Sequence, residues 1–253
     1  MIRLEGADNC RDFSEYVNKE GRKVKPGLFI RSNALYQISR NDIRQLMERY
    51  KLSAVIDLRS SGEIREKPDI RMQGVREYRI SLLDESKAGI SHDKSSEENL
   101  LDLVPDMCEL YSEIAESDYA AQGFGEIFEI ICELPKEGSI LWHCAEGKDR
   151  CGMVSALFLY LLDFDKETIF KDYLKTNDVA MKKGNKYYWA ILFAKRNRKL
   201  AKAVKAAYIA DSAYLQAFFD GLESKYGSVD SFLSEAVGIT EEKKQALKEY
   251  CLE

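Results

Sequence analysis

The segment that most constrains the fold of this chain is residues 139–162, in which an apolar run, a polar loop and a second apolar run follow one another. Residues 139–142 (SILW) are typical of a buried strand, and residues 153–162 are typical of a buried helix. The loop between them, residues 143–150, has the sequence HCAEGKDR. A strand that enters a helix through a tight loop points backbone N–H groups and the positive end of the helix dipole at one place. The segment therefore predicts an anion cradle inside an α/β fold.

The cradle begins with a cysteine and ends with an arginine six positions later. A helix N-terminus and a nearby cation lower the pKa of a cysteine to roughly 3.5–7.5, so we expect Cys144 to be a thiolate nucleophile. Arg150 can hold a phosphate through two parallel hydrogen bonds, and Lys148 adds positive charge. Asp149 is the nearest candidate for the acid that protonates a leaving group. The expected donors to the phosphate oxygens are the loop amides of Ala145, Glu146, Gly147, Lys148, Asp149 and Arg150.

Strand-like runs alternate with helix-like runs in the first part of the chain, which predicts α/β layering. Three or four strands are expected, within residues 28–30, 53–58, 76–83 and 139–143. Ser39, Asp165 and Thr240 are expected to cap helices. The end of the chain has a helical pattern throughout, so we expect a helical elaboration at residues 178–253 within a single domain, residues 1–253.

The charge and hydropathy of the chain limit its partners. The sequence has 38 Lys and Arg and 43 Asp and Glu residues, and this net charge of −5 argues against a nucleic-acid surface and against constitutive membrane docking. No apolar run approaches the roughly 18 residues of a membrane span, so stable membrane insertion is not expected. The first residues lack the apolar segment of a signal peptide, and we expect a cytoplasmic protein.

The six cysteines form no C-x-x-C pair, and the chain has two histidines, His92 and His143. We therefore expect neither a disulfide scaffold nor a metal site, and no cofactor. His143 precedes Cys144 on a strand, where neighbours face opposite ways, so we expect it to shape the loop through backbone hydrogen bonds rather than to act as a base. His92 lies in a polar stretch, residues 84–99, that is typical of a mobile surface loop.

The loop also has a family resemblance. Its Cys-x5-Arg pattern with a preceding His, in the GKDR form, is similar to the phosphate loop of the atypical bacterial and fungal protein tyrosine phosphatases. NCRDF at residues 9–13 resembles the N-terminal Asn-Phe-Arg-Asp-Leu element of that family, and residues 21–32 and 55–60 match its next two blocks. The resemblance covers most of the chain up to about Asn177. Further matching positions are Glu63, Pro68 and Asp69.

This resemblance implies a protein-tyrosine-phosphatase-like fold, a mixed central sheet flanked by helices. It also implies a cysteine-dependent phosphomonoesterase that works through a phosphocysteine intermediate. The implied substrates are phosphotyrosine-containing proteins, with other phosphomonoesters and phosphoinositides as further classes. Because that family carries its acid within the loop, the resemblance points again to Asp149.

Several positions depart from the family pattern, among them Ser14 and Glu15, which replace the usual Gly-Gly after the N-terminal element. Cys151 stands where the family has Ser or Thr, whose hydroxyl assists hydrolysis of the phosphocysteine, so we expect slower turnover than in a Cys151→Thr variant. Cys151, and Cys10 in place of a Phe, are candidates for a reversible disulfide with Cys144. Glu146 brings negative charge into the loop, which should disfavour highly charged inositol head groups.

The sequence leaves the roles of two further side chains, Asp84 and Arg59, open. Asp84 follows a strand and is the alternative to Asp149 as the acid. Arg59 lies at a strand end, where it either approaches the substrate or forms an ion pair with Asp57 or Glu63.

Function also has alternatives. One is a phosphate-binding or redox-regulated pseudo-phosphatase module, but such a module would be expected to have a damaged loop, and this loop retains Cys144, Asp149 and Arg150. Another is a rhodanese-type sulfurtransferase, which would not need Lys148 and Asp149 before an arginine. The basic and aromatic stretch at residues 182–205 is either a lid or rim of the site or a solvated helix face.

Overall fold

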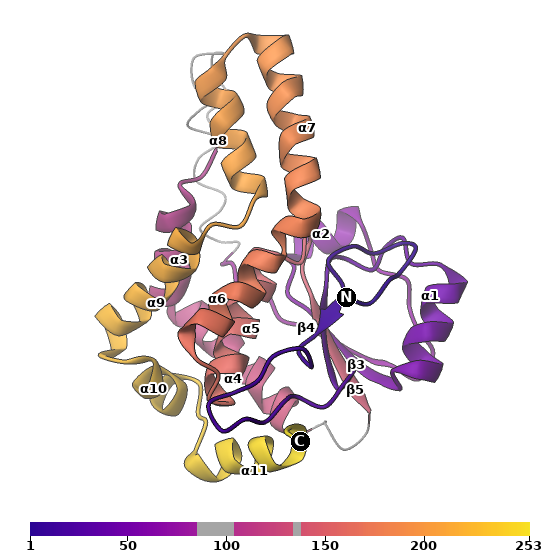
Figure 1. Cartoon of the computed structure of the whole chain (residues 1–253), viewed down its shortest axis with the longest axis vertical. Helices are drawn as coiled ribbons and strands as arrows, with labels where there is room; N and C mark the ends of the chain where they lie inside the picture. Colours follow the sequence, from indigo (N-terminus) through magenta and orange to yellow (C-terminus); the bar gives the residue numbers. More distant parts are fainter. Residues whose placement is uncertain (85–103, 134–137) are drawn as a thin grey trace.

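A five-stranded mixed sheet flanked by helices forms the centre of the protein (Figure 1). The computed structural model describes residues 1–84, 104–133 and 138–253. The strands are β1 (Arg11–Asp12), β2 (Phe29–Ser32), β3 (Leu52–Asp57), β4 (Arg76–Arg79) and β5 (Ser139–His143). Their order across the sheet is β1-β2-β5-β3-β4, with β1 antiparallel to β2 and the other pairs parallel. The expected fold class is confirmed.

The strands differ from the sequence expectation at both edges of the sheet. The sheet has one strand more than expected, β1. Its two residues are too few to show an alternating apolar pattern, and its pairing with β2 defines it. β4 ends at Arg79 rather than near Leu83. The backbone N–H of Ile80 still donates to the carbonyl oxygen of Asp57 at 2.9 Å, and beyond this bond the chain leaves the sheet.

β5 is the central strand, and all five of its residues are buried. Successive side chains enter two different hydrophobic clusters, Ile140 and Trp142 on one face and Leu141 on the other, as expected for a strand covered on both sides. The ring centroid of Trp142 lies 6.1 Å from that of Phe29 and 5.5 Å from that of Phe158. This packing fixes the end of β5, where the HCAEGKDR loop begins.

The helices before and after this loop supply the layers of the fold. They are α1 (Arg40–Arg44), which continues as the π-helical turn η1 (Gln45–Arg49), α2 (Ser61–Glu66), α3 (Met107–Glu116), α4 (Asp118–Glu133) and α5 (Asp149–Leu161). α5 starts four residues earlier than the apolar run at residues 153–162 suggests. Asp149 and Arg150 therefore belong to its first turn.

Helices make up the described chain beyond α5. They are α6 (Lys166–Lys175), α7 (Asn177–Lys195), α8 (Arg198–Tyr208), α9 (Ser212–Tyr226), α10 (Val229–Ser231), the π-helical turn η4 (Phe232–Ala236) and α11 (Glu241–Cys251). α7 and α8 form an antiparallel hairpin that projects from the body of the protein at the top of Figure 1. The expected N-caps Ser39, Asp165 and Thr240 are confirmed, since each side chain accepts a hydrogen bond from the backbone N–H three residues on.

Two expectations fall wholly or partly outside the described residues. The loop expected at residues 84–99, including His92, is described only at Asp84. Within the described ranges, no helix is both long enough and apolar enough to cross a membrane.

Candidate active site

The HCAEGKDR loop joins β5 to α5 at the carboxyl edge of the parallel strands, where open α/β sheets bind their ligands. Gly147 has a φ of +65°, and a Cβ at this position would lie 2.6 Å from the carbonyl oxygen of Ser32. Both the dihedral angle and the close approach of the Ser32 backbone require glycine. The loop ends at the N-terminus of α5, the positive end of the helix dipole.

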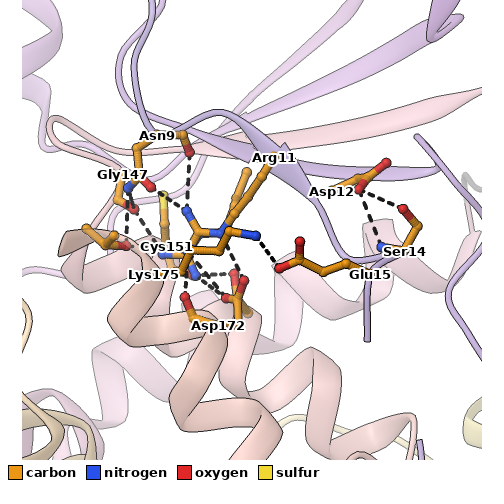
Figure 2. A network of polar contacts seen from close by, with 12 residues as sticks. Asn9, Arg11, Asp12, Ser14, Glu15, Gly147, Cys151, Asp172 and Lys175 are labelled. Atoms are coloured by element: carbon orange, nitrogen blue, oxygen red, sulfur yellow. Dashed lines mark hydrogen bonds and ion pairs between the residues drawn. The ribbon is translucent and has the colours of Figure 1, made fainter. Parts of the chain in front are cut away.

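Two side chains from the N-terminal part of the chain hold the outer side of the loop. Nδ2 of Asn9 donates to the carbonyl oxygen of Gly147 at 2.8 Å (Figure 2). Nη2 of Arg31 donates to the same oxygen at 2.9 Å and to the carbonyl oxygen of Lys148 at 3.3 Å. In a trans peptide, C=O and N–H point opposite ways, so the N–H groups of Lys148 and Asp149 face away from these anchors. The anchors thereby fix the direction of two expected phosphate donors.

Arg31 is in turn held by Asp172 of α6. Asp172 also binds Arg11 (Figure 2). Nη1 of Arg31 lies 2.7 Å from Oδ2 of Asp172, and Nε of Arg11 lies 2.9 Å from Oδ1. All three side chains are 1% exposed or less. Burial raises the pKa of Asp172, but the two guanidiniums outweigh it and lower this pKa, so the carboxylate is charged. Removing it would leave two buried cations unpaired, which is strongly destabilising.

Cys144 is 2% exposed, and the pKa of its thiol is lowered to about 5. The largest cause is a hydrogen bond from the Cys151 side chain; the positive charge of Arg150 and the backbone N–H of Cys151 act in the same direction, and burial opposes them. Cys144 is therefore a thiolate at neutral pH, the form in which a cysteine is a nucleophile.

The neighbouring cysteines remain thiols. Burial, followed by the contact with Cys144, raises the pKa of Cys151 well above its usual range. Burial also raises the pKa of Cys10 to about 12, against the opposing influence of the Ser32 side chain. The sulfur that contacts the Cys144 thiolate is thus that of Cys151. Sγ of Cys151 also lies 3.6 Å from the carbonyl oxygen of Ser32, its backbone neighbour on β2.

Arg150 lies in the first turn of α5 and forms a two-pronged ion pair with Glu63. Nη1 lies 2.6 Å from Oε2 and Nη2 lies 2.8 Å from Oε1, while Nη1 also contacts the carbonyl oxygen of Leu58 at 3.3 Å. Although burial raises the pKa of Glu63, the bonds and charge of Arg150 lower it to about 2. Three of the five guanidinium N–H donors serve these contacts within the described chain, so two remain to grip a phosphate.

Asp149 is positioned by two tyrosines. The hydroxyl of Tyr111 in α3 donates to Oδ1 of Asp149 at 2.7 Å. The hydroxyl of Tyr173 in α6 lies 2.8 Å from that of Tyr111. Both rings are buried, and burial is the largest cause that raises the pKa of each phenol, so both stay protonated as hydrogen-bond donors. A chain of two hydroxyls therefore orients the Asp149 carboxyl in the loop.

The side chain of Lys148 has a different position from the one expected from the sequence. Its Nζ donates to the carbonyl oxygens of Ala207 and Ile209 at 2.7 and 3.1 Å, and lies 3.1 Å from Oδ1 of Asp149. The ammonium therefore ties the loop to the C-terminal end of α8, where carbonyls without helical partners favour a cation. The expectation that its charge points at a phosphate is corrected, and the backbone amide of Lys148 remains the candidate donor.

A buried ion network lies at the start of the loop. Nε2 of His143 is 2.9 Å from Oδ2 of Asp69, so the expected backbone partner of this histidine is replaced by a carboxylate. Arg59 is 2% exposed, and its Nη2 contacts carboxylate oxygens of both Asp57 and Asp69, at 2.8 and 2.7 Å. Arg59 forms the ion pair with Asp57 and also lines the cavity beside the loop, whereas Glu63 pairs with Arg150.

The same network contains the group whose donor atoms could surround a metal ion, namely Asp57, Asp69 and His143. The guanidinium of Arg59 already bridges the two carboxylates. A cation therefore occupies the place that a metal ion would take, and the cluster is better explained as the support of the loop entrance.

A cavity of about 650 Å³ opens beside the loop. Ala145, Glu146 and Lys148 contribute to its wall, while Cys144, Asp149 and Arg150 lie outside this lining. Ala145 follows Cys144 in the sequence, and Glu63 pairs with Arg150. Both residues line the cavity, so the cavity adjoins the reactive groups. α7 contributes three cations to the same wall, Lys182, Lys183 and Lys186. The basic stretch at residues 182–205 thus forms part of a rim, and Glu146 pairs with Lys183 across it.

Asp84 lies at a different hollow of about 520 Å³. The two hollows share Arg59 in their walls, but the second one is lined by residues such as Ser61, Arg79 and Tyr119 and by no residue of the loop. Asp149 therefore lies in the loop itself and its charge acts on the Cys144 thiol, whereas Asp84 lines a hollow to which the loop contributes no residue.

Sequence reasoning assigned no role to Asn9, Arg11, Arg31, Tyr111 or Asp172. Three of them lie in motif blocks, which was a signal of importance without a stated contact. Asp172 had a physical signal as well, because an acid next to Tyr173 on the buried face of an amphipathic helix requires a partner.

A family model described as the tyrosine phosphatase family matches residues 2–253 of the chain. A protein of Cupriavidus necator named as a tyrosine-protein phosphatase is 25% identical over 245 residues, which cover 94% of this chain and 84% of that protein. The triple specificity protein phosphatase PtpB of Mycobacterium tuberculosis is 26% identical over 194 residues, 69% of this chain and 68% of PtpB. Among solved structures, the core catalytic domain of the PP-IP phosphatase Siw14 from S. cerevisiae aligns with a TM-score of 0.36 at 15% identity, over 88% of this chain and 96% of that domain.

Proposed function

Because this chain belongs to the tyrosine phosphatase family and is a phosphoric monoester hydrolase of that kind, we propose that it hydrolyses its substrates through a phosphocysteine on Cys144. The observation that carries the proposal is the Cys144 thiol, whose pKa is lowered to about 5 in a loop that ends in Arg150. A thiolate facing fixed N–H donors and a guanidinium is suited to attack phosphorus, because the donors neutralise the charge on the phosphoryl oxygens.

The proposed reaction has two steps. Sγ of Cys144 forms a bond to phosphorus while the bond from phosphorus to the ester oxygen breaks, and the departing oxygen takes a proton from Asp149. A water molecule then attacks phosphorus, gives a proton to Asp149, and the sulfur–phosphorus bond breaks to release inorganic phosphate and the thiolate. Arg150 holds the phosphoryl oxygens in both steps, together with the amides of the loop.

We propose phosphotyrosine-containing proteins as the principal substrates, with other phosphoproteins and phosphoinositides as further ones. The family supports the first class. The printed name of the Mycobacterium tuberculosis relative gives that protein a triple specificity, which supports a broader range. The pairing of Glu146 with Lys183, and the cationic wall residues Lys182 and Lys186, reduce the penalty that Glu146 alone would impose on a polyanionic head group.

We further propose that residues 1–253 work as one phosphatase domain with residues 178–253 as its helical elaboration. Two observations support this: the family model extends to residue 253, and one hydrophobic cluster contains Phe158 of α5 as well as Phe218 of α9 and Leu247 of α11.

Release of inorganic phosphate from phosphotyrosine, phosphoserine and phosphoinositide substrates tests the proposal. Wild type should release phosphate, Cys144→Ser should release none, and rapid mixing should reveal a burst of leaving group. Asp149→Ala should slow the ester with a poor leaving group far more than an activated aryl phosphate. Equal rates for wild type and Asp149→Ala would remove the acid role from Asp149.

The rival functions predict different results. A phosphate-binding module would bind phosphate without releasing it from any ester. A rhodanese-type enzyme would form thiocyanate from thiosulfate and cyanide, with the same dependence on Cys144. Measuring both on the same preparations distinguishes the three classes.

A further inference from the structure

We propose that the α7–α8 hairpin docks on a membrane surface that carries anionic lipid head groups. The proposed surface is the exposed outer part of the hairpin, from Trp189 to Lys199, and it does not depend on the proposed reaction. It stands on three observations: exposed aromatic side chains near the tip, a concentration of cations around them, and a base that is fixed to the rest of the protein.

The aromatic side chains near the tip are unusually exposed for their size. Phe193 is 77% exposed and Trp189 is 53% exposed, the largest exposed fractions among the big aromatic residues of the described chain. They are one helical turn apart on α7, and their rings stack with centroids 5.8 Å apart. Two stacked apolar rings facing water indicate a surface built to be covered. Trp is also enriched at membrane–water interfaces, where its ring sits at the level of the head groups.

The hairpin carries most of its charge with one sign. Residues 177–208 contain nine Lys and Arg residues and one acidic residue, a net charge of +8 in a chain whose net charge is −5. The turn at the tip is formed by Arg196, with a φ of +49°, and by Asn197, which caps α8. Every residue from 193 to 199 is exposed, and the cations Arg196, Arg198 and Lys199 lie in this stretch. The overall negative charge, which argued against membrane docking, conceals this local distribution.

The base of the hairpin is fixed, so the tip is held in place rather than left free. Asn177 at the start of α7 exchanges two hydrogen bonds with the backbone of Ala210, of 2.8 and 2.9 Å. Lys148 of the loop donates to the carbonyl oxygens of Ala207 and Ile209 at the end of α8. A fixed base lowers the entropy cost of docking, because the aromatic rings are already presented together.

The exposed aromatic pair begins within one helical turn of the wall of the 650 Å³ cavity. Lys186 of α7 lines the cavity, and Trp189 follows it three residues later, within one turn of the same helix. A membrane in contact with Trp189 would therefore lie near the cavity entrance.

The observations favour a membrane over the other two occupants of such a surface. A second copy of this chain docked hairpin to hairpin would bring two segments of charge +8 together, which is repulsive. An acidic protein would satisfy the cations but does not account for the stacked pair of exposed apolar rings. An anionic bilayer provides both a negative surface for the cations and an apolar layer for the rings.

The chain offers a built-in probe, because it contains two tryptophans and the other one, Trp142, is fully buried. Adding vesicles of 30% phosphatidylserine in phosphatidylcholine to the full chain should shift Trp189 emission to shorter wavelength, and the protein should cosediment with them. Pure phosphatidylcholine should bind at least about tenfold more weakly, and added salt should weaken binding. A Trp189→Ala/Phe193→Ala variant should lose cosedimentation, and Arg196→Glu/Arg198→Glu should bind at least about tenfold more weakly.

Matched controls are Tyr119→Ala, an exposed aromatic on α4, and Lys243→Glu, an exposed cation on α11; neither should change binding. All variants should keep wild-type circular dichroism and wild-type turnover of a small soluble phosphate ester. The proposal is overturned if wild type fails to sediment with anionic vesicles at low salt, or if the tip variants bind as well as wild type. It is also overturned if sedimentation velocity reveals a dimer that the tip variants abolish, or if a soluble acidic polypeptide binds the tip while vesicles do not.

Discussion

The HCAEGKDR loop and the α7–α8 hairpin line the same cavity but are built in opposite ways. The loop is enclosed by buried charged groups such as Asp172 and Arg31, which come from elements far apart in the sequence. The hairpin presents exposed lysines and aromatic rings on two helices that contact each other. Changes behind the loop should therefore act on stability and on the chemical step together. Changes in the hairpin should act on what the site binds.

The largest effect is expected from Asp172→Ala. It leaves Arg11 and Arg31 as unpaired buried cations, which should lower the free energy of unfolding by about 3–5 kcal/mol and reduce turnover by loosening Arg31 from Gly147. Chemical denaturation and phosphate release measure the two effects. Glu167→Ala, an exposed acid on the same helix, should stay within about 0.5 kcal/mol of wild type.

A milder variant keeps this prediction testable if Asp172→Ala does not fold. Asn9→Ala keeps both buried guanidiniums paired with Asp172, but it removes the side-chain hydrogen bonds of Asn9 to Gly147, Arg11 and Thr176, so it should reduce stability by about 2–4 kcal/mol. Its turnover should nevertheless fall. Unchanged turnover in a folded Asn9→Ala protein would mean that the anchors stabilise the fold without setting the loop geometry.

The next effect concerns the acidity of the nucleophile. The pKa of Cys144 is lowered to about 5 in the folded protein, so the reactive thiolate is present above about pH 5 and is lost as pH falls through that value. Cys151→Ala removes the side-chain hydrogen bond that contributes most to this shift. A hydrogen bond to a charged group is worth about 1.5–3 kcal/mol, so the pKa of Cys144 should rise by about one to two units. The acid limb of the pH profile, where reactivity is lost as pH falls, should move up by the same amount. The rate of iodoacetamide labelling of Cys144 against pH measures the limb directly.

Cys151→Thr is the matched control, because threonine keeps a donor beside Cys144. The acid limb should stay near pH 5, and hydrolysis of the phosphocysteine should become faster than in wild type. An acid limb that moves as far in Cys151→Thr as in Cys151→Ala would assign the low pKa to Arg150 and the backbone rather than to this side chain.

Local sequence patterns predicted the parts of the site that depend on neighbouring residues. The strand–loop–helix order, the positions of Cys144 and Arg150 in it, and the cap at Ser39 are set within a few residues. The contacts that hold the loop were not predictable in the same way. Asp172 meets Arg11 across 161 positions of the sequence, and no short pattern encodes which buried acid will meet which buried base.

Lys148 illustrates a second limit of the sequence. Its position between Gly147 and Asp149 suggests a phosphate contact, yet its ammonium binds the carbonyl ends of α8, about 60 residues later. Only the placement of α8 decides between the two directions. The position of a residue in a motif thus indicates the role of its backbone more reliably than that of a long side chain.

A smaller effect, expressed in turnover rather than in stability, is expected from Tyr111→Phe. The variant removes the hydroxyl that donates to Oδ1 of Asp149 at 2.7 Å, while the ring stays in the core. A lost hydrogen bond of about 0.5–1.5 kcal/mol corresponds to a decrease in kcat of up to about tenfold. Tyr173→Phe is the control, because its hydroxyl contacts Tyr111 and should affect kcat less. A larger decrease in kcat for Tyr173→Phe than for Tyr111→Phe would contradict a positioning role for Tyr111.

The smallest effect is expected on the hairpin side of the cavity, and it separates the two regions most directly. Lys186 lines the cavity and is exposed, so its attraction for an acidic phosphopeptide is screened by water and is worth roughly 0.2–1 kcal/mol. Lys186→Gln should therefore raise KM by up to about fivefold, leave kcat unchanged, and lose this difference at high salt because salt screens exposed charges. Lys202→Gln, an exposed cation of α8 outside the cavity wall, should leave both constants unchanged. A fall in kcat for Lys186→Gln would show that the hairpin takes part in the chemical step, and the contrast between a fixed loop and a binding rim would then be wrong.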